Sequence, residues 1–230
     1  MKKFCIITPD RKDRKEFLEH CKYQMSQQTL QPSKHYIVDY RVIVKGNDLL
    51  GRLVYGLNQA AQDGFNICFI IENDDYYPND YLEKMYDAFI KSRKDMIGIG
   101  ETYLYHLFKE SYNVYIHPLR APLFCTGFKI DKVLPYLIPP ILKPLGISII
   151  LIDMYLYNIS HTQLSRKIII NGLFKFPESS PIGIKHGIGK CSTRAHTKPV
   201  NYRPDKQGKQ LQYIRKESLD FYNQLKIEYA

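Results

Sequence analysis

The sequence predicts an α/β protein built as a three-layer α/β/α sandwich around a mainly parallel central sheet. Short apolar segments, typical of buried strands, alternate with amphipathic helical segments through about the first hundred residues. This alternation is the pattern of a mainly parallel sheet that is covered by helices. A hydrophobic content of 44% and a charged content of 24% are those of an ordinary globular chain, which excludes a disordered one.

The individual elements follow from the spacing of apolar residues. The expected strands of the first half lie at 2–9, 35–40, 66–71 and 95–105. The expected helices between them lie at 10–28, 49–64 and 79–93. The second half is less regular. It has strand-like pieces at 114–130, the start of a helix at 149–160, a loop-rich segment at 172–198 and a final helix from about Lys209 to Tyr229. No linker composition marks a boundary, so we expect one domain over residues 1–230.

Charge and cysteine usage restrict the setting. The net charge of +10 favours an anionic partner such as nucleic acid, an acidic polymer or a membrane surface. Five widely spaced cysteines without a C-x-x-C pair are expected to be reduced, mostly buried thiols in a reducing compartment. The apolar stretch 133–152 is interrupted by four prolines and Lys143, so we expect no transmembrane segment there, while a peripheral membrane contact stays open. The N-terminus lacks the apolar core of a signal peptide.

Polar residues follow three of the expected strands, at Thr8–Arg11, Asp39 and Glu72–Asp75. Ligands of open parallel sheets bind beyond the carboxyl ends of the strands, so we expect these clusters to converge on one crevice. There is no G-x-G-x-x-G after the first strand and no P-loop motif anywhere. The sequence therefore disfavours a Rossmann dinucleotide site and a P-loop.

The acids of "FIIENDDYYPND" (69–80) predict a metal site. Glu72, Asp74 and Asp75 repel one another unless a cation neutralises them or one binds a proton. Mg²⁺ and Mn²⁺ prefer oxygen ligands and are often held by one or two carboxylates together with substrate phosphates. The segment thus indicates a metal–diphosphate site. The alternative is that these acids only favour the N-terminus of the following helix.

The order of "IITPDR", "IVDY" and "GLNQAAQDGFNICFIIENDD" resembles the family 2-like glycosyltransferases of the GT-A fold. The resemblance covers residues 3–85, and more loosely 119–186. It implies a nucleotide-sugar-dependent glycosyltransferase with Mn²⁺ or Mg²⁺ as cofactor. It also implies that Asp39 contacts the nucleotide base and that Asp74, beside Asp75, is the main metal ligand. Glu72 stands where the first Asp of the family's D-x-D motif is usual.

The same resemblance assigns further roles. Asp153 is expected to be the general base that accepts the proton of the acceptor hydroxyl, the alternative being a helix cap. His186 is expected as a further metal or diphosphate contact, the alternative being an ordinary loop residue. Other residues expected to bind the nucleotide-sugar are Thr8, Pro9, Arg11, Arg52, Asn73 and Lys190. Thr126 and Gly127 are expected on the acceptor side, or else form a plain core strand with a glycine bend. The two arginines could equally be solvated helix charges.

Basic residues dominate the segment 185–216, where Tyr202 and Tyr213 are interleaved. Such a strip is suited to a phosphate backbone, the alternative being a solvated basic tail or a contact with anionic lipid or polysaccharide. Small basic glycosyltransferases of this kind resemble virus-encoded enzymes that glycosylate modified bases in DNA. The expected partners are a UDP-sugar donor and an anionic acceptor, for which a flipped hydroxymethylated DNA base is one choice. A cell-surface polysaccharide or a glycolipid is another.

On this basis we expect a nucleotide-binding half at 1–100, an acceptor-side half at 101–230 and a cytoplasmic location. A nucleotidyltransferase and a non-catalytic nucleotide-sugar-binding protein remain alternatives.

Overall fold

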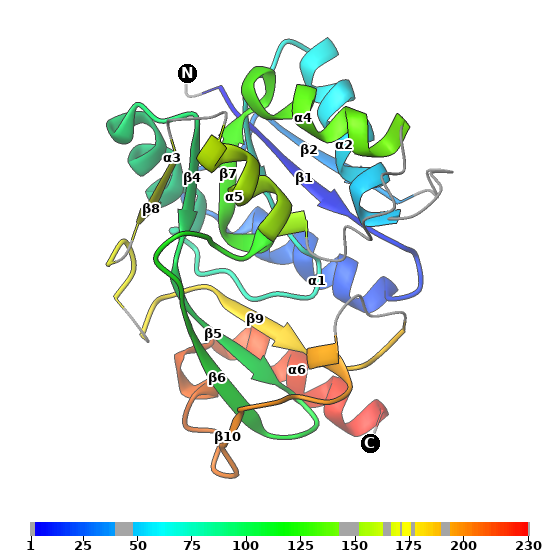
Figure 1. The fold of residues 1–230 in the computed structure, drawn as a ribbon. Coiled ribbons are helices and arrows are strands. Elements are labelled where there is room, and N and C mark those ends of the chain that lie inside the picture. Colours follow the sequence, from blue (N-terminus) through cyan, green and yellow to red (C-terminus); the bar gives the residue numbers. More distant parts are fainter. Residues whose placement is uncertain are drawn as a thin grey trace.

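The computed structural model describes residues 3–39, 48–142, 152–162, 167–170, 172–175, 178–189 and 194–229 (Figure 1). The described residues form a six-stranded sheet and a four-stranded sheet. The first hundred residues supply strands β1 (Cys5–Pro9), β2 (Lys34–Val38), β3 (Ile67–Ile70) and β4 (Met96–Ile99). They alternate with helices α1 (Lys15–Ser26), α2 (Asp48–Gln62) and α3 (Tyr81–Ser92). The predicted alternation is therefore confirmed, with helices a few residues shorter than expected.

The larger sheet has the order β2-β1-β3-β7-β4-β8. The two strands of this sheet that come from the second half of the chain are β7 (Thr126–Lys129) and β8 (Lys167–Ile170). Strand β7 runs antiparallel to both of its neighbours, whereas the other adjacent pairs are parallel. The prediction of an α/β fold with a mainly parallel central sheet is confirmed.

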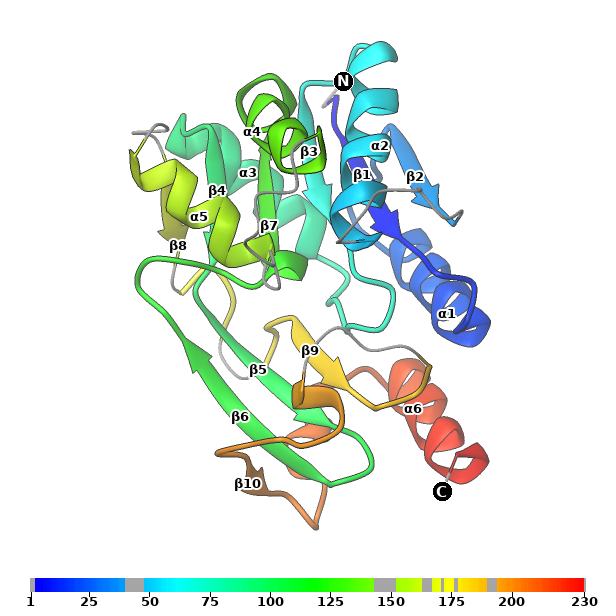
Figure 2. The same ribbon diagram turned by 45° about the vertical axis from the view of Figure 1, so that its right-hand side comes forward.

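Helices cover both faces of this sheet. Gly56 of α2 lies so close to β1 that a Cβ there would be 3.0 Å from the Ile7 side chain. Phe4 points to the opposite face and packs on Tyr86 of α3, with ring centroids 5.2 Å apart. Helix α4 (Ile130–Leu142) packs beside α2. The sheet is thus the middle of three layers (Figures 1 and 2).

The smaller sheet has the order β10-β6-β5-β9 and was not expected from the sequence. Its strands are β5 (Glu101–His106), β6 (Ser111–Ile116), β9 (Ile182–Lys185) and β10 (Arg203–Pro204). The prediction of one strand at 95–105 is wrong, because β4 ends at Ile99 and β5 continues in the other sheet. The chain changes sheet at Gly100, which lies between the two strands. The Gly100 carbonyl already accepts from the backbone N–H of His117, at 2.9 Å, and so continues the pairing of β5 with β6.

Two further predictions for the second half need correction. Strand β9 lies inside the segment 172–198 that was expected to be loop-rich. The final helix, α6 (Lys216–Glu228), begins later than expected because residues Leu211–Tyr213 form a separate 3₁₀ turn. Helix α6 lies beside the smaller sheet, near α1 (Figure 2). The division of residues 1–230 into one domain with two functional halves stays a prediction.

The remaining expectations concern membranes and thiols. Within the described residues, no helix has both the length and the apolar character needed to cross a bilayer. The apolar stretch 133–152 begins in α4, whereas residues 143–151 lie outside the described part. The four described cysteines are buried free thiols, as predicted: Cys5, Cys21, Cys68 and Cys125.

Candidate functional site

The loop of residues 72–75 follows β3 and is largely buried. Asp75 is 0% exposed and Asp74 is 8% exposed. Gln24 of α1 holds the loop from one side. Its Nε2 donates to the Asp75 carbonyl at 3.0 Å, and its Oε1 accepts from the Tyr77 N–H at 2.8 Å. The acids therefore sit on a loop whose backbone is fixed by a buried amide.

Strand β9 of the smaller sheet holds the same loop from the other side. Tyr76 and Ile182 exchange two backbone hydrogen bonds, of 2.9 and 3.0 Å. The Ile184 N–H donates to Asp75 Oδ1 at 2.7 Å. The Lys185 Nζ lies 4.0 Å from the same oxygen. The site is thus built where the end of β3 meets the second sheet.

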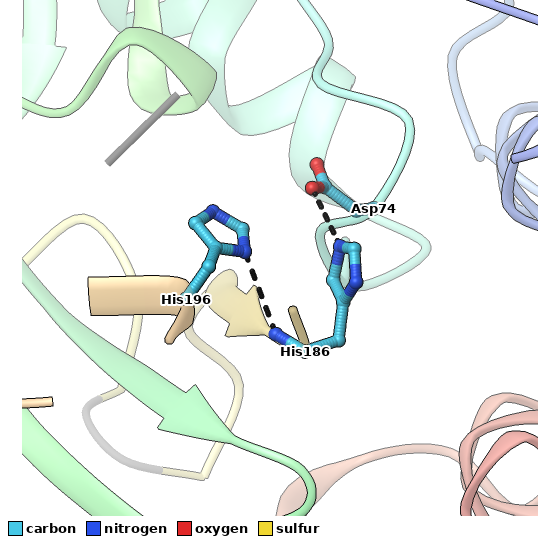
Figure 3. Close-up of side chains that lie close together, drawn as sticks. All are labelled: Asp74, His186 and His196. Carbon is cyan, nitrogen blue, oxygen red and sulfur yellow. Dashed lines mark hydrogen bonds and ion pairs between the residues drawn. The ribbon is translucent and has the colours of Figure 1, made fainter. Parts of the chain in front are cut away.

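Asp74 pairs with a histidine and an arginine through one oxygen. Its Oδ2 accepts from Arg14 Nη1 at 2.7 Å and lies 3.1 Å from His186 Nε2 (Figure 3). The Ile188 N–H donates to His186 Nδ1 at 2.9 Å. Burial lowers the pKa of His186, so the ring is neutral at pH 7. Because Nδ1 accepts a hydrogen bond, the ring proton is on Nε2 and faces Asp74.

Arg14 joins the loops after β1 and β3. Its side chain is only 11% exposed. Nη2 donates to Asn73 Oδ1 at 3.3 Å, and Asn73 Nδ2 in turn donates to Asp10 Oδ1 at 2.6 Å. Asn73, predicted to bind the nucleotide-sugar, is therefore engaged in a bridge between two strand ends.

The three acids of the loop differ in how easily they ionise. Burial raises the pKa of Glu72 to about 7, and the charge of Asp74 adds to the rise. Burial also raises the pKa of Asp75 well above its usual range, against the opposing effect of Lys185. Burial acts the same way on Asp74, but the Arg14 guanidinium holds its pKa well below the usual range. Additional positive charge beside Glu72 and Asp75 would favour their ionisation.

Asp74, His186 and His196 form a group that could hold a metal ion (Figure 3). One donor atom of each lies within 4.8 Å of the others, and all three residues are buried. The backbone N–H of His186 donates to His196 Nδ1 at 3.5 Å. In addition, Asp75 Oδ2 is buried without a hydrogen-bond partner among the described residues. A carboxylate and two imidazoles near an unsatisfied carboxylate oxygen fit a divalent cation.

Asp153 lies in the first turn of α5 (Ile152–Thr162) and is partly buried. Burial raises its pKa, and nearby Arg120 opposes this effect. The charge of Asp153 contributes to the raised pKa of Glu72, so the Asp153 carboxyl lies near Glu72. Its role as general base stays a prediction.

The strand-end residues predicted to bind a nucleotide-sugar are neighbours. Thr8 and Pro9 are buried at the end of β1, and Thr8 Oγ1 lies 2.8 Å from His35 Nε2. Asp39 follows β2 and pairs with Lys12 Nζ at 3.3 Å. The loops after β1, β2 and β3 are therefore linked to one another. Contact of these residues with a nucleotide stays a prediction.

The two predicted diphosphate arginines share one carboxylate. Arg11 Nε donates to Asp48 Oδ2 and Arg52 Nε donates to Asp48 Oδ1, both at 3.1 Å. Arg52 also donates to the Val38 carbonyl at 3.2 Å, and its side chain is 5% exposed. The alternative of a solvated helix charge is wrong for Arg52. Lys190 lies outside the described residues.

The predicted acceptor-side residues are packed in the sheet. Thr126 is fully buried, donates to the Pro122 carbonyl at 2.9 Å and lies 3.1 Å from the Tyr157 hydroxyl of α5. Gly127 lies against Phe69, whose ring would be 2.2 Å from an added Cβ. These contacts are those of the core-strand alternative. Contact with an acceptor stays a prediction for both.

No known protein family and no curated protein sequence matches the chain. Solved structures do resemble it. S. aureus TarS 1–349 in complex with UDP-GlcNAc aligns over 80% of this chain and 59% of that chain, at 12% identity and a TM-score of 0.47. The same TarS chain with UDP aligns over 79% and 60%, at 11% identity and a TM-score of 0.48.

A mannose-1-phosphate geranyltransferase from Thermus thermophilus aligns over 75% of this chain and 74% of that one, at 11% identity and a TM-score of 0.39. The chain spans about three fifths of the length of the TarS structures. Similarity at this level does not support a functional assignment, so the inference of a function depends on the residues of the site.

Sequence reasoning missed three residues of the site: Arg14, Gln24 and His196. Arg14 belongs to the charged run "DRKDRKEF", which has the composition of a solvated helix start. Gln24 is a polar residue on the buried side of an amphipathic helix, three residues after Cys21 and next to Met25. His196 lies ten residues after His186, a spacing without a metal-motif signature. Only the three-dimensional pairing of distant segments brings them together.

Proposed function

We propose that this chain is a divalent-metal-dependent glycosyltransferase that moves a sugar from a nucleotide-sugar, with a UDP-sugar favoured, to a hydroxyl acceptor. One observation carries the proposal: among the described residues, the largely buried carboxyl groups of this site outnumber the cations beside them. Glu72, Asp74, Asp75 and Asp153 lie close to Arg14, Lys185 and Arg120. A bound divalent cation would favour ionisation of the carboxyl groups whose pKa is raised and would present positive charge to a diphosphate.

Asp74, His186 and His196 are the residues that would hold the cation. Their two imidazoles suit Mn²⁺ better than Mg²⁺, which prefers oxygen and water ligands. When bound, the cation would stabilise the charge of the departing nucleotide diphosphate. Asp74 is already ionised because of its low pKa. For His186 Nε2 to bind the cation, the ring proton would have to move from Nε2 to Nδ1, because a metal needs the Nε2 lone pair and the neutral imidazole keeps one proton.

Asp153 would accept the proton of the acceptor hydroxyl as that oxygen attacks the sugar. Its partial burial raises its pKa, which brings the carboxylate closer to the working pH and makes it a better base. Its position in the first turn of α5 directs negative charge toward the acid loop. The helix N-terminus would at the same time favour the ionised form.

The acceptor is the least specified part of the proposal. Several exposed basic residues follow β9: Lys198, Arg203, Lys206, Lys209 and Lys216. Together with the net charge of +10, they support an anionic acceptor, of which a hydroxymethylated base in DNA is one. Lys185 does not belong to this exposed set, because it is buried beside Asp75.

A donor and acceptor screen tests the proposal. UDP- and GDP-sugars are incubated with Mn²⁺, and nucleotide release is measured alone, with hydroxymethylated duplex DNA and with an acidic polysaccharide. Slow UDP release without acceptor, accelerated by one of the two, is the expected result. A flat response to salt on DNA would exclude the nucleic-acid acceptor. Nucleotide-sugar binding without turnover would point to a non-catalytic binding protein, and an absence of binding ends the proposal.

Two variants separate binding from transfer. Asp74→Asn is expected to abolish Mn²⁺-dependent donor binding. Asp153→Asn is expected to keep donor binding and to lower transfer by about 100-fold or more, the usual contribution of a general base. Asp131→Asn is the matched control, since Asp131 is an exposed acid in the first turn of α4. Full transfer by Asp153→Asn would remove Asp153 from the mechanism.

A further inference from the structure

The guanidinium of Arg14 lies against the donor atoms that would hold a metal ion. Nη1 is 2.7 Å from Asp74 Oδ2 and 3.1 Å from His186 Nε2. Both nitrogens carry protons, so they do not bond to each other and instead share the Asp74 oxygen as acceptor. Arg14 therefore already provides the positive charge that pairs with the Asp74 carboxylate.

Contacts with Phe17 and Gly189 hold the Arg14 side chain in this position. Its guanidinium carbon lies 5.8 Å from the centroid of the Phe17 ring, and that ring also packs on the His186 ring, with centroids 4.4 Å apart and an angle of 32° between the ring planes. Gly189 covers the aliphatic part, because a Cβ there would lie 3.2 Å from Arg14 Cγ. A side chain with this many specific contacts is not a solvated surface charge.

A metal ion at Asp74 Oδ2 and the guanidinium of Arg14 cannot occupy the same place. Metal–carboxylate distances are about 2 Å, so a cation on this oxygen would lie within a few ångströms of Nη1. Two positive charges so close together repel strongly in a partly buried site. Loading the metal therefore requires the guanidinium to leave Asp74.

We propose that Arg14 is the resident counter-ion of Asp74 and that it exchanges with the divalent cation when a nucleotide diphosphate binds. This inference rests on the proposed function. The displaced guanidinium is a planar fork suited to phosphate oxygens, so the arriving diphosphate offers it a new partner. When the metal binds without nucleotide, Arg14 loses its pairing with Asp74 and gains no new partner. When the metal and the nucleotide bind together, the diphosphate replaces Asp74 as the partner of Arg14, so the binding of metal and nucleotide is cooperative.

Mn²⁺ binding in the absence of any sugar or acceptor tests the exchange. Free Mn²⁺ is measured by electron paramagnetic resonance during titration of wild type, Arg14→Gln and Lys15→Gln, each with and without UDP. Lys15→Gln is the matched control, because Lys15 is the exposed neighbour of Arg14 and its loss changes the net charge equally. Circular dichroism and thermal melting establish that each variant is folded.

Arg14→Gln is expected to bind Mn²⁺ about tenfold more tightly than wild type without UDP, because no internal cation competes. Lys15→Gln is expected to stay within about twofold of wild type, since exposed charges are screened. UDP should tighten Mn²⁺ binding by wild type about tenfold more than it does for Arg14→Gln, since only wild type gains the new phosphate contact.

Three results would overturn the inference: equal Mn²⁺ affinities of Arg14→Gln and Lys15→Gln, no Mn²⁺ binding by Arg14→Gln, or the same UDP effect in wild type and Arg14→Gln. The second would mean that Arg14 takes the place of a metal permanently. If Arg14→Gln does not fold, Arg14→Lys keeps the charge but loses the fork. Without UDP it should bind Mn²⁺ about as wild type does, because a competing cation remains, and it should gain less Mn²⁺ affinity from UDP because the fork is lost; a UDP effect equal to that of wild type overturns the exchange. UDP-sugar turnover is measured separately, so the first and third results leave the glycosyltransferase proposal standing, whereas the second removes its metal dependence.

Discussion

At the scale of single residues, one buried glutamine fixes the loop that carries the acids. Gln24 is 0% exposed and satisfies both the Asp75 carbonyl and the Tyr77 N–H. Gln24→Leu would leave these two backbone groups buried without partners, at about 1–3 kcal/mol each. We expect the free energy of unfolding to fall by about 2–4 kcal/mol, as measured by urea denaturation.

The neighbouring Gln27 provides the control. It is exposed at the end of α1, so Gln27→Leu is expected to change the free energy of unfolding by less than about 0.5 kcal/mol. Equal effects of the two substitutions would mean that Gln24 does not hold the acid loop. A second reading comes from Mn²⁺ binding, which Gln24→Leu should weaken and Gln27→Leu should not.

The acids of the site could be predicted from the sequence, but the residues that pair with them could not. Asp74 and Asp75 stand out in the sequence because consecutive acids after a buried strand need a cation or a bound proton to offset their repulsion. Arg14 does not stand out, because it is one of several basic residues in a single charged run. Which of them turns inward depends on β9, more than 160 residues away, which brings His186 to the same place. A local sequence pattern does not predict contacts between segments so far apart in the chain.

At the scale of elements, the sequence predicted strands that pair with near neighbours and missed those that pair far away. Strands β1, β2 and β3 are separated by single helices, and each shows a clear apolar run. Strand β9 pairs with β5 across about eighty residues and lies among glycines and prolines that resemble a loop. The periodicity of apolar residues therefore did not predict the second sheet, whose strand β9 ends at Lys185 and is followed by His186.

The pairing of β3 with β7 yields a prediction about packing. Phe69 lies directly opposite Gly127, and a Cβ on Gly127 would overlap the Phe69 ring at 2.2 Å. Phe69 cannot move freely, because its ring packs edge-on against Phe4 and Phe89. Gly127→Ala is therefore expected to lower the free energy of unfolding by about 1–3 kcal/mol, measured by urea denaturation.

A double-mutant cycle checks the cause. Phe69→Leu removes the edge of the ring that meets residue 127, so Gly127→Ala should cost less in that background than in wild type. Additive effects would show that the two positions do not meet as described. If Gly127→Ala instead left stability unchanged and altered only acceptor use, the acceptor-side role of Gly127 would gain support over the packing role.

At the scale of the whole molecule, α1 connects the two sheets. One side of α1 packs on the larger sheet through Cys21, whose Sγ lies 4.0 Å from Thr8 Oγ1. The other side meets α6, where the His20 ring stacks on Phe221 with centroids 4.1 Å apart. Arg14 and Gln24, near its two ends, contact the acid loop between the sheets. The geometry of the site thus depends on α1 staying in contact with both halves.

Acid is expected to weaken the contact of α1 with α6. Burial lowers the pKa of His20 to about 4 from an ordinary value of 6.5, and the Arg215 charge adds to the effect. Between these two values the unfolded chain binds a proton that the folded chain does not. The stabilisation from neutral His20 is therefore fully present above about pH 6.5 and is lost as the pH falls toward 4. The loss approaches about 3 kcal/mol at most.

Urea denaturation of wild type and His20→Gln between about pH 7 and pH 4 measures this contribution. Carboxyl groups with a raised pKa, such as Glu72, act in the opposite direction, because the folded state then binds protons more readily than the unfolded chain. They are common to both proteins, so the difference between the two profiles isolates His20. Glutamine can still bond to Ser218, which lies 3.1 Å from His20 Nε2, but it cannot titrate. The wild-type profile should fall more steeply toward acid, and parallel profiles would show that protonation of His20 does not control the packing of α6 on α1.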